Sequence, residues 1–172
     1  MTQDYRIKMA FEELQRIEPF DDPDFLFYNH QEALIDPIFD QVNKPKKEEI
    51  IFQELTKGQQ YCYSIVELLG QVHNGGIGQY FFNQRNKFIE FAIEGLNEIG
   101  CVELSRELAM TNNFYLDNKL ELDKLADNDN FSEYLSYFHK SSFQRLFFDQ
   151  IDMMQKKMIE YVESNSSDFI VD

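Results

Sequence analysis

Apolar side chains recur at the spacing of an α-helix in several parts of this chain. In the clearest segment, residues 59–73, they stand at i, i+3, i+4, i+7 and i+10: Cys62, Ile65, Val66, Leu69 and Val72. This period places them on one face of a helix, whereas a strand would need strict alternation. Glycine and proline, which interrupt helices, number only 7 and 4 in 172 residues. The sequence therefore predicts an all-α fold.

Helical spacing also predicts helices over residues 5–17, 31–42, 47–55, 87–99, 102–115 and 143–163. Thr56 is a candidate N-cap for the helix over residues 59–73, and Gly100 is a natural stop because glycine adopts left-handed backbone angles at little cost. Pro37 lacks a backbone donor, so it would start or kink a helix. We expect the polar residues 117–130 to be mostly loop.

The segment Asn74-Gly75-Gly76 directly follows the helix over residues 59–73. Two glycines after an asparagine are typical of a helix end, where left-handed angles are needed. We therefore predict a turn here between two central helices, with the chain resuming at residues 77–83.

We expect a single all-α domain over residues 1–172. Within it, residues 1–45 are an acidic N-terminal helical extension, residues 46–164 form the core, and residues 165–172 are a frayed tail that begins at the end of the last helix, near Ser164. A chain of this length buries roughly 70% of the surface that it exposes when unfolded. We interpret the phenylalanines at helical spacing as core rather than as the lining of a ligand pocket: Phe81, Phe82, Phe88, Phe91, Phe147 and Phe148.

The chain has 31 acidic and 16 basic residues, and its formal net charge is −15. This charge repels nucleic acid phosphates and anionic lipid head groups, and it attracts basic proteins. We therefore expect no direct binding of DNA or RNA. Residues 1–40 contain ten acids and three bases, residues 41–100 seven and six, and residues 101–172 fourteen and seven. The near-neutral middle segment is predicted to form the packed centre, and the two ends the negative surface.

The three histidines offer little support for catalysis. At the predicted end of its helix, His73 would be favoured in its protonated form by the helix dipole, but no Ser or Cys is spaced as a nucleophile beside it. We interpret His73 as a structural cap, and His30 and His139 are no better candidates. An enzyme that uses His73 and nearby carboxylates is the weakest of our functional hypotheses, so we expect no enzymatic activity.

Neither acidic cluster matches a known metal site. The carboxylates around His30 follow no known ligand spacing. A calcium loop counted from Asp127 would need glycine at Ser132 and a bidentate acid at Phe138. No phosphate-binding glycine loop is present, because residues 75–78 lack the lysine and the preceding strand. We therefore expect neither a metal nor a cofactor.

Cysteine usage and hydropathy indicate the compartment. Cys62 and Cys101 each lie in an apolar segment, which is typical of reduced core residues. No apolar run approaches the roughly 18 residues of a membrane span, and residues 1–6 lack the basic and apolar pattern of a secretory signal. We expect a cytoplasmic protein that does not interact with a membrane.

Residues 71–83, with the sequence QVHNGGIGQYFFN, resemble the signature of the bacterial DNA-mimic protein family. The match continues through Ala92, Leu96, Ile99 and Gly100, so the similarity covers residues 50–115 and, more weakly, the C-terminal helix. Gln71 and Ile77 depart from the signature, which has glutamate and phenylalanine there.

Five residues match the signature closely, namely Asn74, Gly75, Gly76, Gln79 and Tyr80. We interpret them as structural. The amide side chains would close the backbone groups of the predicted turn, and Tyr80 and Phe81 would pack beneath it.

The resemblance implies an acidic protein that occupies the DNA-binding surface of a regulator such as a helix-turn-helix repressor. Our leading hypothesis is therefore a non-enzymatic DNA mimic that competes with DNA for a basic protein. The alternative is an immunity or antitoxin protein that neutralises a cationic toxin. The sequence names neither the partner nor an oligomeric state. The candidate partner-binding residues are acids of the two negative segments: Asp21, Asp22, Asp24, Asp36, Asp40, Asp117, Asp123, Asp127 and Asp129.

Overall fold

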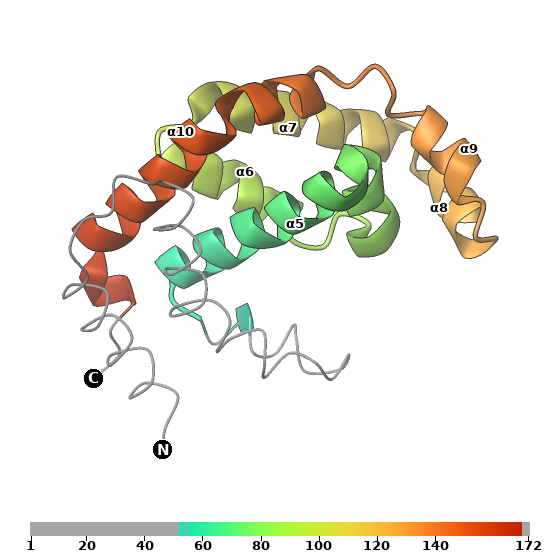
Figure 1. Cartoon of the computed structure of the whole chain (residues 1–172). Coiled ribbons are helices and arrows are strands. Elements are labelled where there is room, and N and C mark those ends of the chain that lie inside the picture. The colour runs from blue at the N-terminus through green and yellow to red at the C-terminus, as the bar shows by residue number, and fades with distance from the viewer. Residues whose placement is uncertain (1–51, 54, 170–172) are drawn as a thin grey trace. The chain divides into compact units, whose positions relative to one another are not determined.

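Residues 52–53 and 55–169 are described by the computed structural model. They contain six α-helices, one short 3-10 helix and no strand, which confirms the predicted all-α fold. The elements are α5 (Lys57–Gln84), α6 (Ile89–Glu98), α7 (Val102–Asp117), α8 (Lys119–Asp127), α9 (Phe131–Ser136), α10 (Ser142–Ser164) and η2 (Ser166–Asp168) (Figure 1). No helix in this described part is long and apolar enough to cross a membrane.

The predicted N-terminal features lie outside the described residues. These are the helices over residues 5–17 and 31–42, most of the helix over residues 47–55, His30, and the five acids between Asp21 and Asp40. The described part of the chain divides into two units. Residues 52–63 and 152–169 belong to the first unit, and residues 64–151 belong to the second.

In the first unit, α5 begins with a reciprocal cap. The backbone N–H of Gln59 donates to Thr56 Oγ1 at 3.3 Å, and the backbone N–H of Thr56 donates to Gln59 Oε1 at 3.1 Å. This Thr-x-x-Gln arrangement is a capping box, in which two backbone donors at the helix start find partners. It confirms the prediction that Thr56 is the N-cap.

Residues 165–169, the described part of the predicted frayed tail, are packed against the rest of the first unit. Residues 166–168 form η2, and the Thr56 hydroxyl donates to the Asp168 carbonyl oxygen at 2.6 Å. Phe169 is buried, with its ring against the edge of Tyr161. Burial of this aromatic side chain is the physical reason that the described tail packs instead of fraying.

In the second unit, α6 and α7 lie side by side (Figure 1). The turn between them is a Schellman motif at Gly100, which has a φ of 81°. The backbone N–H of Cys101 donates to the Leu96 carbonyl at 2.7 Å, and that of Gly100 donates to the Asn97 carbonyl at 3.0 Å. The predicted stop at Gly100 is therefore confirmed.

Aromatic rings form much of the core of this second unit. Phe81 of α5 stacks between Tyr115 of α7 and Phe138, which follows α9, with ring centroids 4.8 and 5.4 Å away. Phe82 meets the edges of Phe131 and Tyr134 of α9. Of the six predicted core phenylalanines, three are fully buried, but Phe148 is 45% exposed. The core interpretation is therefore wrong for Phe148.

The prediction of a loop over residues 117–130 is wrong for most of that segment, because residues 119–127 form α8. Leu122, Leu125 and Ala126 are its buried residues, and they stand at i, i+3 and i+4. This short apolar stripe is a helical signal that the surrounding charged and amide residues mask. Tertiary packing of the stripe stabilises a helix that would be marginal alone.

Candidate functional site

The signature residues lie at a bend in α5. Where the sequence predicts a turn, α5 has a kink: Gly75 and Gly76 have non-helical angles and separate two helical stretches, of which the second ends at Gln84. Gly76 has φ 79° and ψ 178°, a combination that essentially only glycine adopts. The helix resumes at once because Ile77, Tyr80 and Phe81 are all buried, so packing holds the second half in place.

Glycines at the bend also permit close approach of other helices. A Cβ atom on Gly76 would lie 2.5 Å from Oε1 of Gln144 in α10. A Cβ atom on Gly78 would lie 2.8 Å from Cδ2 of Leu135 in α9. Gly76 therefore has a positive φ, and a Cβ atom at Gly76 or Gly78 would require the end of a neighbouring side chain to shift.

A network of side-chain amides spans the bend along α5. Gln71 Oε1 accepts from Gln79 Nε2 at 3.1 Å and from Asn83 Nδ2 at 2.7 Å. Gln71 Nε2 donates to Glu67 Oε1 at 2.9 Å, and Gln84 Nε2 donates to the same oxygen at 2.6 Å. Gln79 therefore bonds to another side chain rather than to the backbone of a turn, which corrects that part of our structural interpretation.

Tyr80 and Phe81 are both fully buried at the second half of the bend, as the sequence interpretation expects. Burial raises the pKa of the Tyr80 hydroxyl, and the charge of Glu67 raises it further. The residue therefore stays neutral and serves as packing. Asn74 is exposed on the helix.

Two of the predicted partner-binding acids, Asp123 and Asp127, form hydrogen bonds or ion pairs with other side chains of the protein. Asp123 of α8 accepts from the Tyr115 hydroxyl at 2.9 Å and from Lys119 Nζ at 2.7 Å. Burial opposes ionisation of Asp123, but these hydrogen bonds hold its pKa below its ordinary value. Asp127 forms an ion pair with Arg85 at 3.4 Å, at the end of α5. Both carboxylates therefore help to join α8 to its neighbours.

The other described candidates, Asp117 and Asp129, are exposed. Asp117 is the last residue of α7, and Asp129 follows α8 with a positive φ of 53°. Neither carboxylate forms a hydrogen bond or ion pair with another described residue. The structure therefore brings Asp123 close to Asp127 on α8 and leaves Asp117 and Asp129 available at its two ends.

A further acidic face lies on α6, where the sequence analysis placed none. Glu90, Glu94 and Glu98 stand at i, i+4 and i+8 and are all exposed, and this helix of ten residues has no basic residue. Like charges at this spacing repel one another, and Glu98 lies at the helix end that disfavours anions. The summed charge of residues 41–100 is close to neutral and does not indicate this face. The recurrence of glutamate at every fourth residue is the sequence signal that would have predicted it.

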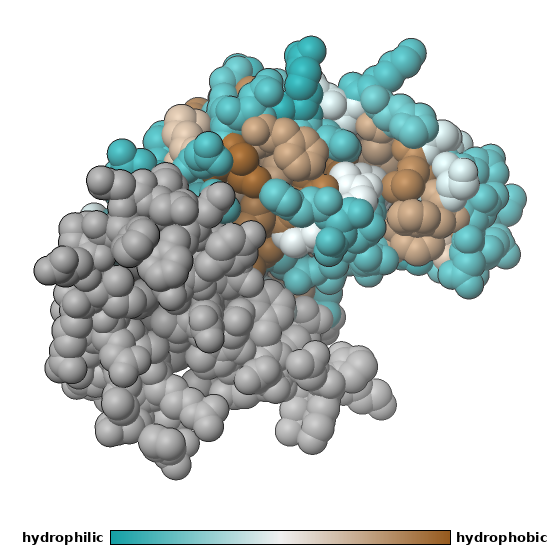
Figure 2. All heavy atoms as spheres, in the orientation of Figure 1, coloured by the Kyte–Doolittle hydropathy of each residue, from teal (hydrophilic) through white to brown (hydrophobic). Residues whose placement is uncertain are grey.

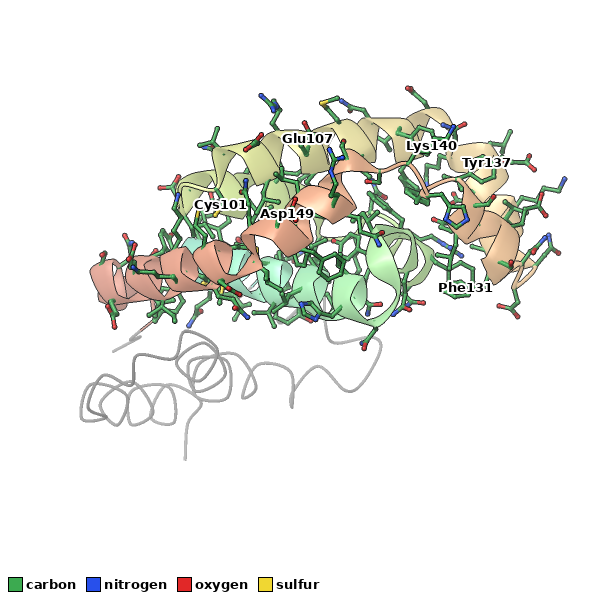
Figure 3. All side chains as sticks on the ribbon, turned by 45° about the horizontal axis from the view of Figure 1, so that its top comes forward. Cys101, Glu107, Phe131, Tyr137, Lys140 and Asp149 are labelled. Atoms are coloured by element: carbon green, nitrogen blue, oxygen red, sulfur yellow. The ribbon has the colours of Figure 1, made fainter. Side chains whose placement is uncertain are left out.

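Hydrophilic side chains surround separate apolar patches on the face that Figure 2 shows. Large apolar side chains that are at least 38% exposed include Met110, Phe114 and Leu116 of α7, Leu120 of α8 and Phe131 of α9. Figure 3 shows Phe131 at the start of α9 and Glu107 on α7. Exposed apolar side chains and hydrophilic side chains therefore both occur on this surface.

His73, which the sequence analysis considered for catalysis, and the two cysteines lie against other packed side chains. His73 is exposed on α5, with its ring against the edges of Phe147 and Phe148 at 6.2 and 5.7 Å. Cys62 and Cys101 are buried and form no disulfide, and burial raises the pKa of Cys62 to about 12. No group of three or more metal-ligating side chains occurs in the part of the chain that the structure describes.

Comparison with known proteins agrees with the resemblance at the bend. The model of the DMP19-like protein family matches residues 53–165, which include the whole signature and all six described α-helices. No curated protein and no solved structure matches the chain. The match spans well over half of the sequence, and the chain therefore belongs to the DMP19-like protein family.

Proposed function

We propose that this chain is a protein-binding DNA mimic. Its acidic surface occupies the DNA-binding site of a basic protein, such as a transcription regulator, and competes there with DNA. Membership of the DMP19-like family and the formal net charge of −15 support this proposal. Binding alone accounts for such a role, so no catalytic step is needed.

The acidic face of α6 is the observation that carries the proposal. Successive glutamates among Glu90, Glu94 and Glu98 are separated by about 6 Å along the axis, because a helix rises about 1.5 Å per residue. Each DNA strand carries one phosphate per roughly 3.4 Å of axis. The face thus offers a regular row of anions at a lower density than DNA, which suits a basic groove that binds phosphates.

This row has a local cost in stability, because like charges four residues apart destabilise a helix by about 0.2–0.5 kcal/mol per pair. A surface that served solubility alone would not need this repeated spacing without a single base. Asp117 and Asp129 extend the acidic surface in the second unit, and we propose that the N-terminal acids between Asp21 and Asp40 contribute as well.

The test compares two variants that lose the same charge. In the first, Glu90→Gln, Glu94→Gln and Glu98→Gln remove the α6 face; in the second, Glu121→Gln, Asp149→Asn and Glu160→Gln remove exposed acids from α8 and α10. Each immobilised protein captures proteins from a host lysate at low salt, and duplex DNA is used to elute them. We expect the first variant to retain about a tenth of the DNA-released partner, and the second to match the natural sequence.

Two results would overturn the proposal. A captured partner that duplex DNA does not displace would favour the immunity or antitoxin alternative, because a toxin need not share its binding site with DNA. Equal capture by the two variants would show that net charge, rather than the α6 face, determines binding.

A further inference from the structure

A pocket of about 370 Å³ lies at the bend of α5, within the second unit. Gly75 and Gly78 of α5 form one wall, and Leu135 and Phe138 of the α9 region form another. The remaining lining comes from the start of α10 and the segment before it: His139, Ser141, Gln144, Arg145 and Phe148. Figure 3 shows that segment through Tyr137 and Lys140, between α9 and α10. The pocket thus combines apolar walls with a polar end.

The ionisable residues that line this pocket are both basic, although the chain is strongly acidic. His139 and Arg145 are exposed, and neither side chain forms a hydrogen bond or ion pair with another described residue. By contrast, Arg85, Arg106 and Lys119 of the same unit each pair with a carboxylate. Arg145 therefore presents an uncompensated guanidinium group, which is suited to bidentate binding of an anion.

The start of α10 adds donors on the same side. The helix has 23 residues and no acid in its first turn, so its first backbone N–H groups and its dipole favour an anion. Independently, the hydroxyl oxygen of Ser141, which lines the pocket, is buried and has no hydrogen-bond partner. A buried hydroxyl without a partner is costly.

A carboxylate already lies at this helix start. Glu107 of α7 accepts from the hydroxyl of Ser142, the first residue of α10, at 2.5 Å and pairs with Arg106 at 3.4 Å. Gln144 Oε1 accepts from the Ile77 backbone N–H at 3.4 Å, which ties the polar end of the pocket to the second half of α5. Glu107 thus interacts with the helix start, whereas the lining of the pocket itself contains two basic side chains and no carboxylate.

We infer that this pocket binds a small organic anion, with a carboxylate or phosphate group on an aromatic or aliphatic body. Arg145 holds the anionic group beside His139. Leu135, Phe138 and Phe148 contact the apolar body. The bound molecule would also rest against Gly75 and Gly78, so its presence would stabilise the bend of α5. This site is separate from the acidic face proposed to bind the partner protein.

The probes are benzoate, phenyl phosphate and benzamide, the last being a neutral analogue of benzoate. The full chain, labelled with nitrogen-15, is titrated with each probe at constant ionic strength, and backbone amide shifts are followed. We expect benzoate or phenyl phosphate to produce saturable shifts at residues 75–78 and 141–145, and benzamide to produce none at the same concentrations. The tighter of the two anions identifies the preferred acidic group.

Arg145→Gln is the decisive variant, and Arg106→Gln is its matched control, because both remove one exposed arginine. We expect Arg145→Gln to weaken anion binding about tenfold or more, the effect of losing a charge-assisted hydrogen bond, and Arg106→Gln to leave it unchanged. Absence of saturable shifts with both anions, equal binding of benzamide, or full affinity in Arg145→Gln would each overturn the inference.

Discussion

Gly76 illustrates how much a single backbone position decides in this protein. We expect Gly76→Ala to lower the free energy of unfolding by about 1–3 kcal/mol, because φ 79° with ψ 178° is strained for any residue with a Cβ atom. The new Cβ atom would also crowd the Gln144 carboxamide. Urea unfolding followed by circular dichroism measures the change.

The control is Gly70→Ala in the first half of α5. Gly70 is exposed and a Cβ atom there would meet nothing within 4 Å, so alanine should raise the free energy of unfolding by about 0.4–1 kcal/mol. Equal effects of the two substitutions would contradict the structural role of the bend.

Gln71 matters because an amide both donates and accepts. We expect Gln71→Glu, the residue of the family signature, to destabilise the protein by about 0.5–1.5 kcal/mol, since a carboxylate cannot donate to Glu67 and repels it. Addition of Glu67→Gln should recover part of the loss, because the donor and acceptor are then exchanged. The unfolding temperatures of the single and the double variant test this prediction. An unchanged unfolding temperature in Gln71→Glu would exclude the amide network as a stabilising feature.

At the scale of elements, Asp123 joins α8 to α7 through Tyr115 and Lys119. Its folded pKa lies below the ordinary value of 3.8, so its contribution to stability is present above that value and is lost as pH falls through the folded pKa. We expect Asp123→Asn to be less stable than the natural sequence at pH 7, and the difference to shrink below about pH 4. Urea unfolding at both pH values tests this sign, and a difference that grows in acid would reject it.

The acidic face of α6 lowers the stability of the protein, because its glutamates repel one another. We expect the variant Glu90→Gln, Glu94→Gln, Glu98→Gln to be more stable by up to about 1 kcal/mol, because two repulsive pairs are removed. The dipole contributions of Glu90, favourable at the helix start, and of Glu98, unfavourable at the helix end, largely cancel. The same variant should lose its binding partner. Calorimetry gives the unfolding temperature, and a lower value than that of the natural sequence would mean that these glutamates stabilise the fold.

At the scale of the whole molecule, the excess of acidic side chains gives a net charge of −15, and their mutual repulsion destabilises the folded state. The Debye length is about 10 Å at 0.1 M salt and about 3 Å at 1 M, so added salt screens this repulsion. We expect the unfolding temperature to rise by a few degrees between about 0.05 and 0.5 M KCl. The rise should be smaller in the α6 variant, whose charge is −15 plus 3, or −12. A fall in unfolding temperature with salt would show that attractive ion pairs dominate instead.

The amino-acid sequence by itself determined the helices with a long apolar stripe, the caps at Thr56 and Gly100, the excess of acid and the family signature. These features depend on residues close together in the chain, where spacing and backbone preference act directly. Only the tertiary structure decided how the two stretches of α5 meet at the kink, because burial of Ile77, Tyr80 and Phe81 holds the second stretch in place. It also decided which acids are available: pairing of Asp127 with Arg85, 42 residues away, depends on packing that local sequence does not encode. The pocket at the bend has the same origin, since its walls come from three separate helices that meet only in the folded chain.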